Sequence, residues 1–210
     1  MGDHGFDTVS SETLFTGKIF ALRADDVRMP GGALARREVV EHYGAVAVVA
    51  LDDDDNVVLV YQYRHALGRR LWELPAGLLD VYGEPPQSTA ARELVEEAGL
   101  TARDWSVLAD VDSAPGFSDE SVRIFLATGL TEVGRPEAAD EEADMTVTRM
   151  PLTEAVAAVF AGEIVNSLAA AGILAAHAVR TGHAEPRPVT AEWRDRPWRF
   201  AQRKQSAAGQ

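Results

Sequence analysis

The chain has 210 residues and a formal net charge of −13, with 46% hydrophobic and 25% charged residues. That length allows one domain with a well-buried core and a small appendage, and the composition is ordinary for a globular protein. The negative charge argues against a non-specific nucleic-acid binder, which relies on Lys and Arg facing phosphates. It leaves room for an anionic substrate whose phosphates are neutralised by bound cations. The absence of cysteine excludes disulfides, thiolate metal sites and cysteine nucleophiles.

The N-terminus lacks the basic region and apolar run of a signal peptide. The longest apolar stretch, near residues 168–179, is interrupted by Gly172 and His177 and is too short to span a bilayer. We therefore expect a soluble cytoplasmic protein with no membrane partner and no nucleic-acid partner.

The first 42 residues predict a small antiparallel β meander. Residues 1–13 are polar, and we expect them to be poorly ordered. The expected strands of the meander cover residues 14–15, 18–23, 26–29 and 36–42. A meander of this size is not stable alone, so it must pack on its own domain or on a second subunit.

A domain over residues 43–182 is expected to follow. Its first strand is Ala45–Leu51, a continuous apolar run that predicts burial on both faces. Four aspartates and Asn56 form a turn signal, so Val57–Tyr63 is predicted to be the hairpin partner of that strand. The aspartates lack the ligand spacing of an EF-hand and are interpreted as a solvated turn.

Further strands are expected at residues 105–111, 121–127 and 145–150, and helices at 86–98, 152–161 and 165–180. Pro85 and Pro86 precede the first of these helices and Gly99 follows it, which matches the residue preferences of helix ends. Strands interleaved with few helices favour an α/β layered domain. Residues 183–210, with three prolines and two tryptophans, are expected to wrap the surface as a tail.

The helix expected over residues 86–98 carries an unusual acidic face of Glu93, Glu96 and Glu97. Glu93 and Glu97 are like-charged neighbours four residues apart, an arrangement that costs roughly 0.2–0.5 kcal/mol. Glu96 and Glu97 lie in the last turn, where the helix dipole disfavours anions by about 0.3–1 kcal/mol. These oxygens suit a hard cation such as Mg²⁺. The alternative interpretation is a solvated surface helix.

The segment around this helix resembles the signature of the Nudix hydrolases: Gly, five residues, Glu, seven residues, then Arg-Glu-apolar-x-Glu-Glu-x-Gly-apolar. The chain supplies Gly77, Glu84 and the run Arg92–Leu100. Six residues instead of five separate Gly77 from Glu84, so the loop that carries Asp80 is one residue longer. The resemblance covers residues 43–165. It implies the Nudix fold, an α/β class with a mixed β-sheet in an α/β/α sandwich, here preceded by the meander.

The resemblance also implies metal-assisted hydrolysis of a nucleoside diphosphate linked to another group, with Mg²⁺ or Mn²⁺ as cofactor. The implied metal ligands are Glu93, Glu97, Glu96 and the backbone carbonyl of Ala76. Arg92 is expected to orient Glu93 and to pair with Glu84, although an ordinary surface salt bridge is also compatible with its position.

Sequences flanking this motif are similar to those of ADP-ribose pyrophosphatases. They are the run Gln62–Arg64 with Trp72–Gly77, and the loop Ala114–Glu120 with Pro115 about fifteen residues beyond the motif. This likeness implies cleavage of ADP-ribose to AMP and ribose 5-phosphate by a homodimer, in which residues 1–42 build the dimer and reach the partner's site. The alternatives are another nucleotide sugar such as GDP-mannose, broad specificity, or a non-enzymatic ADP-ribose sensor.

The same likeness suggests substrate-binding residues: Arg37, Arg64, Asp80 and Glu120. The arginine fork matches phosphate geometry, although a surface ion pair is the alternative for both arginines. Glu97 is expected to be catalytic through its metal. A general base is expected in the acidic segment 137–144, with Glu142 favoured over Glu141; a plain solvated loop is the alternative.

Overall fold

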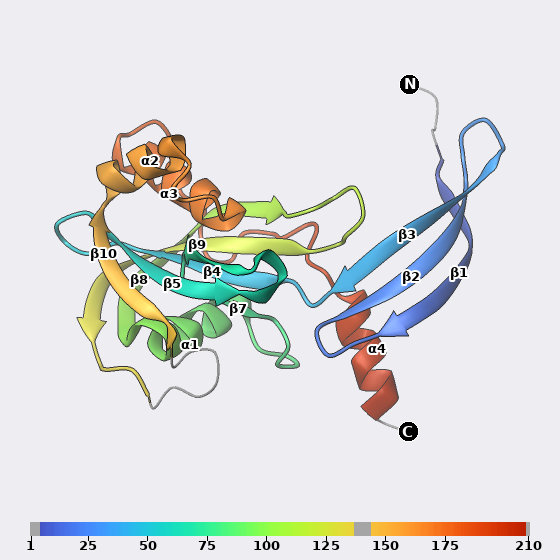
Figure 1. Cartoon of the computed structure of the whole chain (residues 1–210), viewed down its shortest axis with the longest axis horizontal. Helices are drawn as coiled ribbons and strands as arrows, with labels where there is room; N and C mark the ends of the chain where they lie inside the picture. The colour runs from blue at the N-terminus through green and yellow to red at the C-terminus, as the bar shows by residue number, and fades with distance from the viewer. Residues whose placement is uncertain (1–4, 137–143, 209–210) are drawn as a thin grey trace. The chain divides into compact units, whose positions relative to one another are not determined.

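The computed structural model describes residues 5–136 and 144–208 (Figure 1). The chain divides into two compact units. The first consists of Met1–Gly44, Asp112–Ser121 and Asp195–Gln210, and the second of Ala45–Val111 and Val122–Arg194. Both are therefore assembled from segments far apart in the sequence.

The first unit contains an antiparallel sheet of three strands in the order β1 (Asp7–Thr16), β2 (Phe20–Arg28) and β3 (Leu34–His42). The expectation of poor order up to residue 13 is wrong for Asp7 onwards. β1 pairs with β2 from Asp7↔Arg28 to Thr16↔Ala21, and these backbone hydrogen bonds order a polar sequence. The two strands expected at 18–23 and 26–29 form the single strand β2.

The expected tail contains a helix, α4 (Arg199–Ala208), which the sequence analysis missed. Phe200 of α4 is fully buried and its ring packs edge-on against Tyr43, with centroids 4.5 Å apart. Arg203 donates two hydrogen bonds of 2.9 and 2.8 Å to Oε2 of the buried Glu41. One aromatic residue and one ion pair thus hold a helix whose sequence is mostly polar.

The second unit has two sheets. Its strands are β4 (Ala45–Ala50), β5 (Asn56–Arg64), β6 (Arg69–Glu73), β7 (Ala76–Leu78), β8 (Leu100–Asp112), β9 (Ser121–Glu132) and β10 (Thr146–Pro151). The first sheet has the order β7-β4-β9-β8 and is mixed, because β4 runs parallel to β9 and antiparallel to β7. The second, β10-β5-β6, is antiparallel.

The predicted hairpin of β4 and β5 is wrong, because the two strands belong to different sheets. A bridge between Leu51 and Val57 joins them at the turn, after which they diverge. Each strand already has a partner on both edges: β4 pairs with β7 and β9, and β5 pairs with β6 and β10. Neither strand therefore has an edge left for the other.

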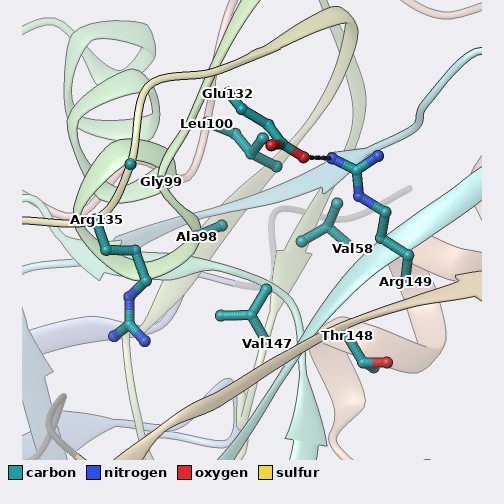
Figure 2. Close-up of a pocket in the computed structure, with 10 residues that line it drawn as sticks. Val58, Ala98, Gly99, Leu100, Glu132, Arg135, Val147, Thr148 and Arg149 are labelled. Carbon is teal, nitrogen blue, oxygen red and sulfur yellow. Dashed lines mark hydrogen bonds and ion pairs between the residues drawn. The ribbon is translucent and has the colours of Figure 1, made fainter.

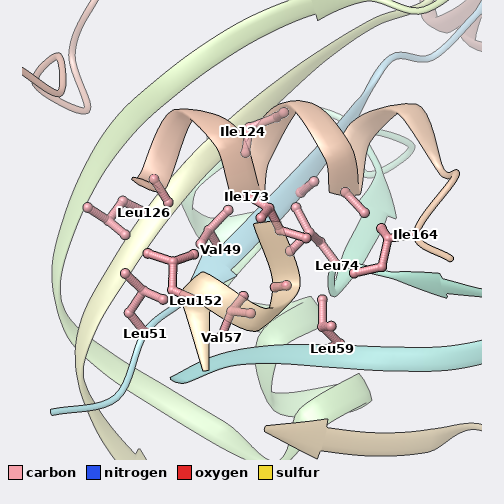
Figure 3. Close-up of a cluster of buried hydrophobic side chains, with 14 of the residues drawn as sticks. Val49, Leu51, Val57, Leu59, Leu74, Ile124, Leu126, Leu152, Ile164 and Ile173 are labelled. Atoms are coloured by element: carbon pink, nitrogen blue, oxygen red, sulfur yellow. The ribbon is translucent and has the colours of Figure 1, made fainter. Parts of the chain in front are cut away.

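Helices α1 (Pro86–Ala98), α2 (Leu152–Ala161) and α3 (Ser167–Arg180) complete the second unit, and a short 3₁₀ turn covers His65–Leu67. Alternate residues of β4 face opposite layers. Val49 packs in a cluster with α2 and α3 (Figure 3), whereas Val48 packs in a cluster with α1. The predicted α/β/α arrangement is therefore confirmed. No helix in the described ranges is both long enough and apolar enough to cross a bilayer.

Candidate active site

Helix α1 has the bounds that its flanking residues predict. Pro86 lies in the first turn, and Gly99 closes the helix in the left-handed conformation at φ 69°. The amide of Gly99 donates to the carbonyls of Leu94 and Val95. A side chain at Gly99 would also lie 2.8 Å from the backbone nitrogen of Arg135, so both conformation and space favour glycine.

The acidic face of α1 packs against β7. Glu97 is only 7% exposed, and its Oε2 accepts a 2.9 Å hydrogen bond from the backbone N–H of Ala76. A Cβ atom added to Gly77 would overlap the carboxylate of Glu93, so the helix can approach β7 this closely only because residue 77 is glycine. The alternative of a fully solvated acidic face is therefore wrong for Glu97.

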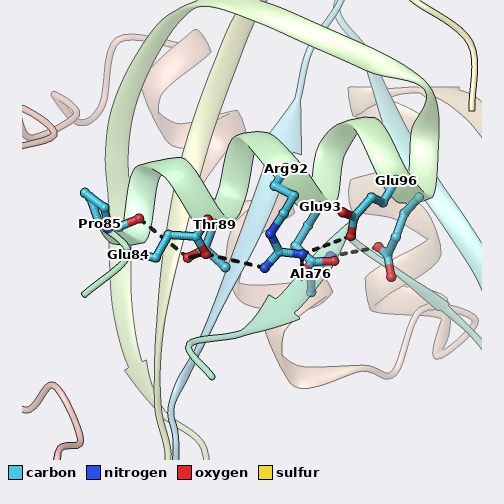
Figure 4. A network of polar contacts seen from close by, with 8 residues as sticks. Ala76, Glu84, Pro85, Thr89, Arg92, Glu93 and Glu96 are labelled. Carbon is cyan, nitrogen blue, oxygen red and sulfur yellow. Dashed lines mark hydrogen bonds and ion pairs between the residues drawn. The ribbon is translucent and has the colours of Figure 1, made fainter. Parts of the chain in front are cut away.

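Arg92 lies at the centre of this face (Figure 4). Its Nη1 donates to Oε1 of Glu93 at 2.7 Å and to Oε2 of Glu96 at 2.9 Å. Its Nη2 lies 3.5 Å from Oε2 of Glu84, which confirms the predicted pairing of these two residues. Partial burial alone would lower the pKa of Arg92, but Glu93 and Glu96 outweigh it and the pKa is raised, so the guanidinium remains charged.

The donor set around Arg92 suits a hard divalent cation. Residues 76–100 carry five carboxylates and one basic side chain, and all the candidate ligands are oxygens. Within residues 5–136 and 144–208, no three acidic or histidine side chains are gathered as a metal site. Glu93 and Glu96 are instead both bound by one guanidinium nitrogen of Arg92. Binding of a cation by these carboxylates would replace part of that contact.

The other predicted residues of the second unit lie near the ends of strands. Arg64 ends β5 and is paired with Glu73, with Nε–Oε1 and Nη2–Oε2 distances of 2.9 and 2.6 Å. Asp80 is exposed in the loop after β7. Glu141 and Glu142 lie outside the described residues, so their roles stay predictions.

Arg37 and Glu120 belong to the first unit. Arg37 is exposed on β3, where its Nη1 donates to the carbonyl of Arg36. Glu120 Oε1 lies 3.4 Å from Nδ1 of His42. The loop before it is docked on β3, since Asp119 Oδ1 accepts the N–H of His42 at 2.8 Å. Burial raises the pKa of Asp119, an effect that this hydrogen bond partly offsets.

Arg135 ties both described flanks of the acidic segment to α1. Its Nε and Nη1 each lie 3.4 Å from a backbone carbonyl oxygen, that of Glu96 and that of Met145 respectively. Beside it, at the C-terminal end of α1, is a cavity of about 250 Å³. Arg149 lines the same cavity and pairs with Glu132 at 3.0 Å (Figure 2). Arg135 and Met145, the described residues on either side of this segment, are thus linked to each other and to the C-terminal end of α1.

Glu73 and Gln62 were not among the predicted site residues. Glu73 is only 3% exposed, and Gln62 Nε2 donates to its Oε2 at 3.3 Å. The signal for Glu73 is an acidic residue inside the otherwise apolar run Leu71–Leu74, because a buried carboxylate needs a cationic or hydrogen-bonding partner. Its partner could not be identified from spacing alone, since it lies on the neighbouring strand.

Comparisons with known proteins point to the same family as the residues of this site. Residues 41–168 match the NUDIX domain, and residues 6–40 match the nucleoside diphosphate sugar hydrolase N-terminal domain. An ADP-ribose pyrophosphatase of Mycobacterium tuberculosis is 68% identical over 97% of this chain and 99% of its own. An ADP-ribose pyrophosphatase of Bacillus subtilis is 38% identical, covering 79% of this chain and 89% of its own. A crystal structure of an ADP compounds hydrolase superposes with a TM-score of 0.69 at 21% identity, over 85% and 97% of the two chains.

Proposed function

The chain belongs to the Nudix hydrolase family and is an enzyme, and we propose that it hydrolyses the diphosphate of ADP-ribose to AMP and ribose 5-phosphate. The observation that carries the proposal is the likeness at 68% identity, over nearly the whole of both chains, to an ADP-ribose pyrophosphatase. The acidic face of α1 supplies the chemistry that such a reaction needs. Its oxygens suit the divalent cations that assist phosphoryl transfer.

We propose Mg²⁺, with Mn²⁺ as the alternative, held by Glu93, Glu96, Glu97 and the carbonyl of Ala76. When bound, the cation screens the diphosphate charge and lowers the pKa of the attacking water. Glu97 is already anchored to β7 through the amide of Ala76. Arg92 restrains the carboxylates of Glu93 and Glu96 and leaves the cluster with an excess of negative charge.

Glu142 is our proposed general base, with Glu141 as the alternative. The described flanks support this assignment, because Arg135 contacts the carbonyl of Glu96 and Arg70 pairs with Asp144. A base on this segment has to reach a water molecule near the metal ligands of α1. Arg135, the described residue that precedes the segment by two positions, contacts that helix directly.

We further propose a homodimer built by residues 1–42, with substrate contacts from Arg37, Arg64, Asp80 and Glu120. β1 supports the dimer, because every residue of this edge strand is exposed, including the apolar Val9, Leu14 and Phe15. A sheet edge with exposed apolar side chains suits a protein partner. Sedimentation velocity of the full chain tests the proposed dimer, and a monomer at micromolar concentration would contradict it.

The proposed reaction is tested by incubating the protein with ADP-ribose and Mg²⁺ and separating the products by anion-exchange chromatography. AMP and ribose 5-phosphate are expected in equal amounts, and excess EDTA should abolish both. A panel that includes GDP-mannose tests the alternative of another nucleotide sugar. Cleavage of a different nucleoside diphosphate compound, with no AMP from ADP-ribose, would show that the proposed substrate is wrong.

A further inference from the structure

An ion pair with a buried carboxylate joins β5 to β6 beside the candidate site. Glu73, the last residue of β6, has a side chain only 4% exposed, whereas the side chain of its partner Arg64 is 44% exposed. Both carboxylate oxygens of Glu73 accept from Arg64, and Gln62 donates a third hydrogen bond. The carboxylate is therefore held from several directions, while the side chain of Arg64 is partly exposed.

The strand register explains how these residues meet. Glu73 lies opposite Val60 in the antiparallel pair, so Arg64 is four residues further along β5. Residues two apart on a strand project from the same face, which places Gln62 and Arg64 on the face of Val60. The carboxylate of Glu73 and the guanidinium of Arg64 thus meet diagonally on this face, in contact with Gln62.

The two-point contact restricts the orientation of the guanidinium. Nε and Nη2 form one edge of its planar fork, and both are bound to Glu73. A bidentate contact of this kind fixes both the position and the plane of an arginine. Glu73 precedes Ala76 by three residues, and the amide of Ala76 binds Glu97. Arg64 is therefore held by a residue just upstream of the proposed metal-ligand cluster.

We propose that Glu73 is a positioning residue, which holds Arg64 in the orientation that binds the diphosphate of the substrate. This inference rests on the proposed function, because it takes a nucleoside diphosphate as the substrate and Arg64 as a phosphate contact. Glu73 itself does not touch the substrate. It fixes the side chain of Arg64 before binding, so that less conformational entropy is lost when the diphosphate binds.

A double-mutant cycle in steady-state kinetics tests the proposal with Glu73→Gln, Arg64→Ala and the double variant. We expect each single change to raise KM about tenfold or more, as for loss of a charge-assisted hydrogen bond, and to change kcat less. Since Glu73 acts through Arg64, the double variant should have a KM within about twofold of Arg64→Ala. Additive effects, or a wild-type KM for Glu73→Gln, would overturn the proposal.

Arg64→Lys covers the case in which Glu73→Gln does not fold. Lysine keeps the charge beside Glu73 and removes the planar fork, so we expect KM to rise; an unchanged KM would overturn the proposal. Asp104→Asn is the matched control, because Asp104 pairs with Arg103 in an ion pair whose side chains are 57% and 78% exposed. Its KM should equal that of the wild type.

Failure of the proposed function has a separate signature. If the wild-type enzyme cleaves another compound of the panel, the cycle is measured with that compound and has the same expected result. If it cleaves none, the dissociation constant of ADP, measured by calorimetry, replaces KM. Non-additive weakening supports the role of Glu73, and additive or absent weakening contradicts it.

Discussion

Two arginines of the second unit lie at the centre of polar clusters that differ in their balance of charge. Arg123 of β9 is 4% exposed and binds both carboxylate oxygens of Asp110, at 2.7 and 3.0 Å. It also donates to the carbonyls of Ala191 and Glu192, and its guanidinium lies 4.9 Å from the ring centroid of Trp193. Arg92 of α1 is one-third exposed and shared among Glu84, Glu93 and Glu96.

The difference lies in the charge balance. Around Arg123, neutral carbonyl oxygens and Asp110, which also pairs with Arg187 at 2.9 Å, satisfy a buried cation, and the result is a fixed attachment for residues 191–193. Around Arg92, one cation faces several carboxylates, an arrangement that stability alone does not favour. A cluster that retains excess negative charge is suited to a bound cation, and such local conflicts are expected at functional sites. We therefore expect variants of the Arg123 cluster to lower stability and variants of the Arg92 cluster to lower activity.

Arg123→Met should have the largest effect on stability. The substitution leaves the carbonyls of Ala191 and Glu192 without this donor and removes one of the two arginine partners of Asp110, which keeps Arg187, so we expect a loss of about 2 kcal/mol in the free energy of unfolding. Urea denaturation measures it, and the turnover of the folded variant should stay within about twofold of wild type. Arg194→Met, at an exposed position in the same segment, is the control and should change stability by less than about 0.5 kcal/mol. A large loss of turnover with unchanged stability would show that Arg123 has a functional and not a structural role.

Glu97→Gln should show the opposite pattern. The amide oxygen of glutamine can still accept the N–H of Ala76, so the fold is kept while a charged metal ligand is lost. We expect kcat to fall by at least about two orders of magnitude, with little change in the urea midpoint. Glu154→Gln, at an exposed position in the first turn of α2, serves as the control. A near-wild-type kcat for Glu97→Gln would exclude the metal role.

Local features of the sequence predicted α1 and its acidic face. Pro86 and Gly99 determine the helix ends through backbone conformation, and the spacing of the glutamates places them on one face. The burial of β4 on both faces also follows from its unbroken apolar run. These features depend on residues close together in the chain, so they can be predicted from a single sequence.

The features that were missed depend on distant partners. The pairing of β4 with β9 and β7, instead of β5, is decided by competition among strand edges that the turn at Asp52–Asn56 does not encode. The pairing of Arg64 with Glu73 requires the β5–β6 register. Helix α4 was missed because its attachment rests on Phe200 and Arg203, whose partners Tyr43 and Glu41 lie about 160 residues earlier. Hydrophobic periodicity carries no information about such contacts.

Gly77→Ala tests whether the cluster around Arg92 depends on close packing. The added methyl group would overlap the carboxylate of Glu93, so either the side chain or the helix must move. We expect kcat/KM to fall about tenfold and the Mg²⁺ concentration for half-maximal activity to rise, since misplacing a ligand weakens metal binding. A magnesium titration of the rate measures this. Gly31→Ala, where an added Cβ meets nothing within 4 Å, is the control, and equal activities of the two variants would show that the close approach has no role.

Asp52→Ala extends the comparison to an acidic cluster that is structural and should have the smallest effect. Oδ1 of Asp52 accepts the backbone N–H of Asn56 at 2.9 Å and that of Asp54 at 3.1 Å, and Oδ2 pairs with Arg149 at 3.3 Å. Burial alone would raise the pKa of Asp52, but these contacts outweigh it and the pKa is lowered from 3.8. The ionised carboxylate thus stabilises the fold above pH 3.8, and this contribution is lost as the pH falls toward the lower folded-state pKa.

We therefore expect Asp52→Ala to lower the free energy of unfolding by about 1 kcal/mol at pH 7. The difference from wild type should shrink below pH 4, because the protonated side chain of the wild type has lost part of its advantage. Urea denaturation at pH 7, 5, 4 and 3 measures this trend, with the exposed Asp53→Ala as control. A difference that stays constant down to pH 3 would mean that Asp52 acts through packing and not through its charge. Unchanged turnover for Asp52→Ala would then separate this aspartate from the carboxylates around Arg92, whose charge we propose that the reaction requires.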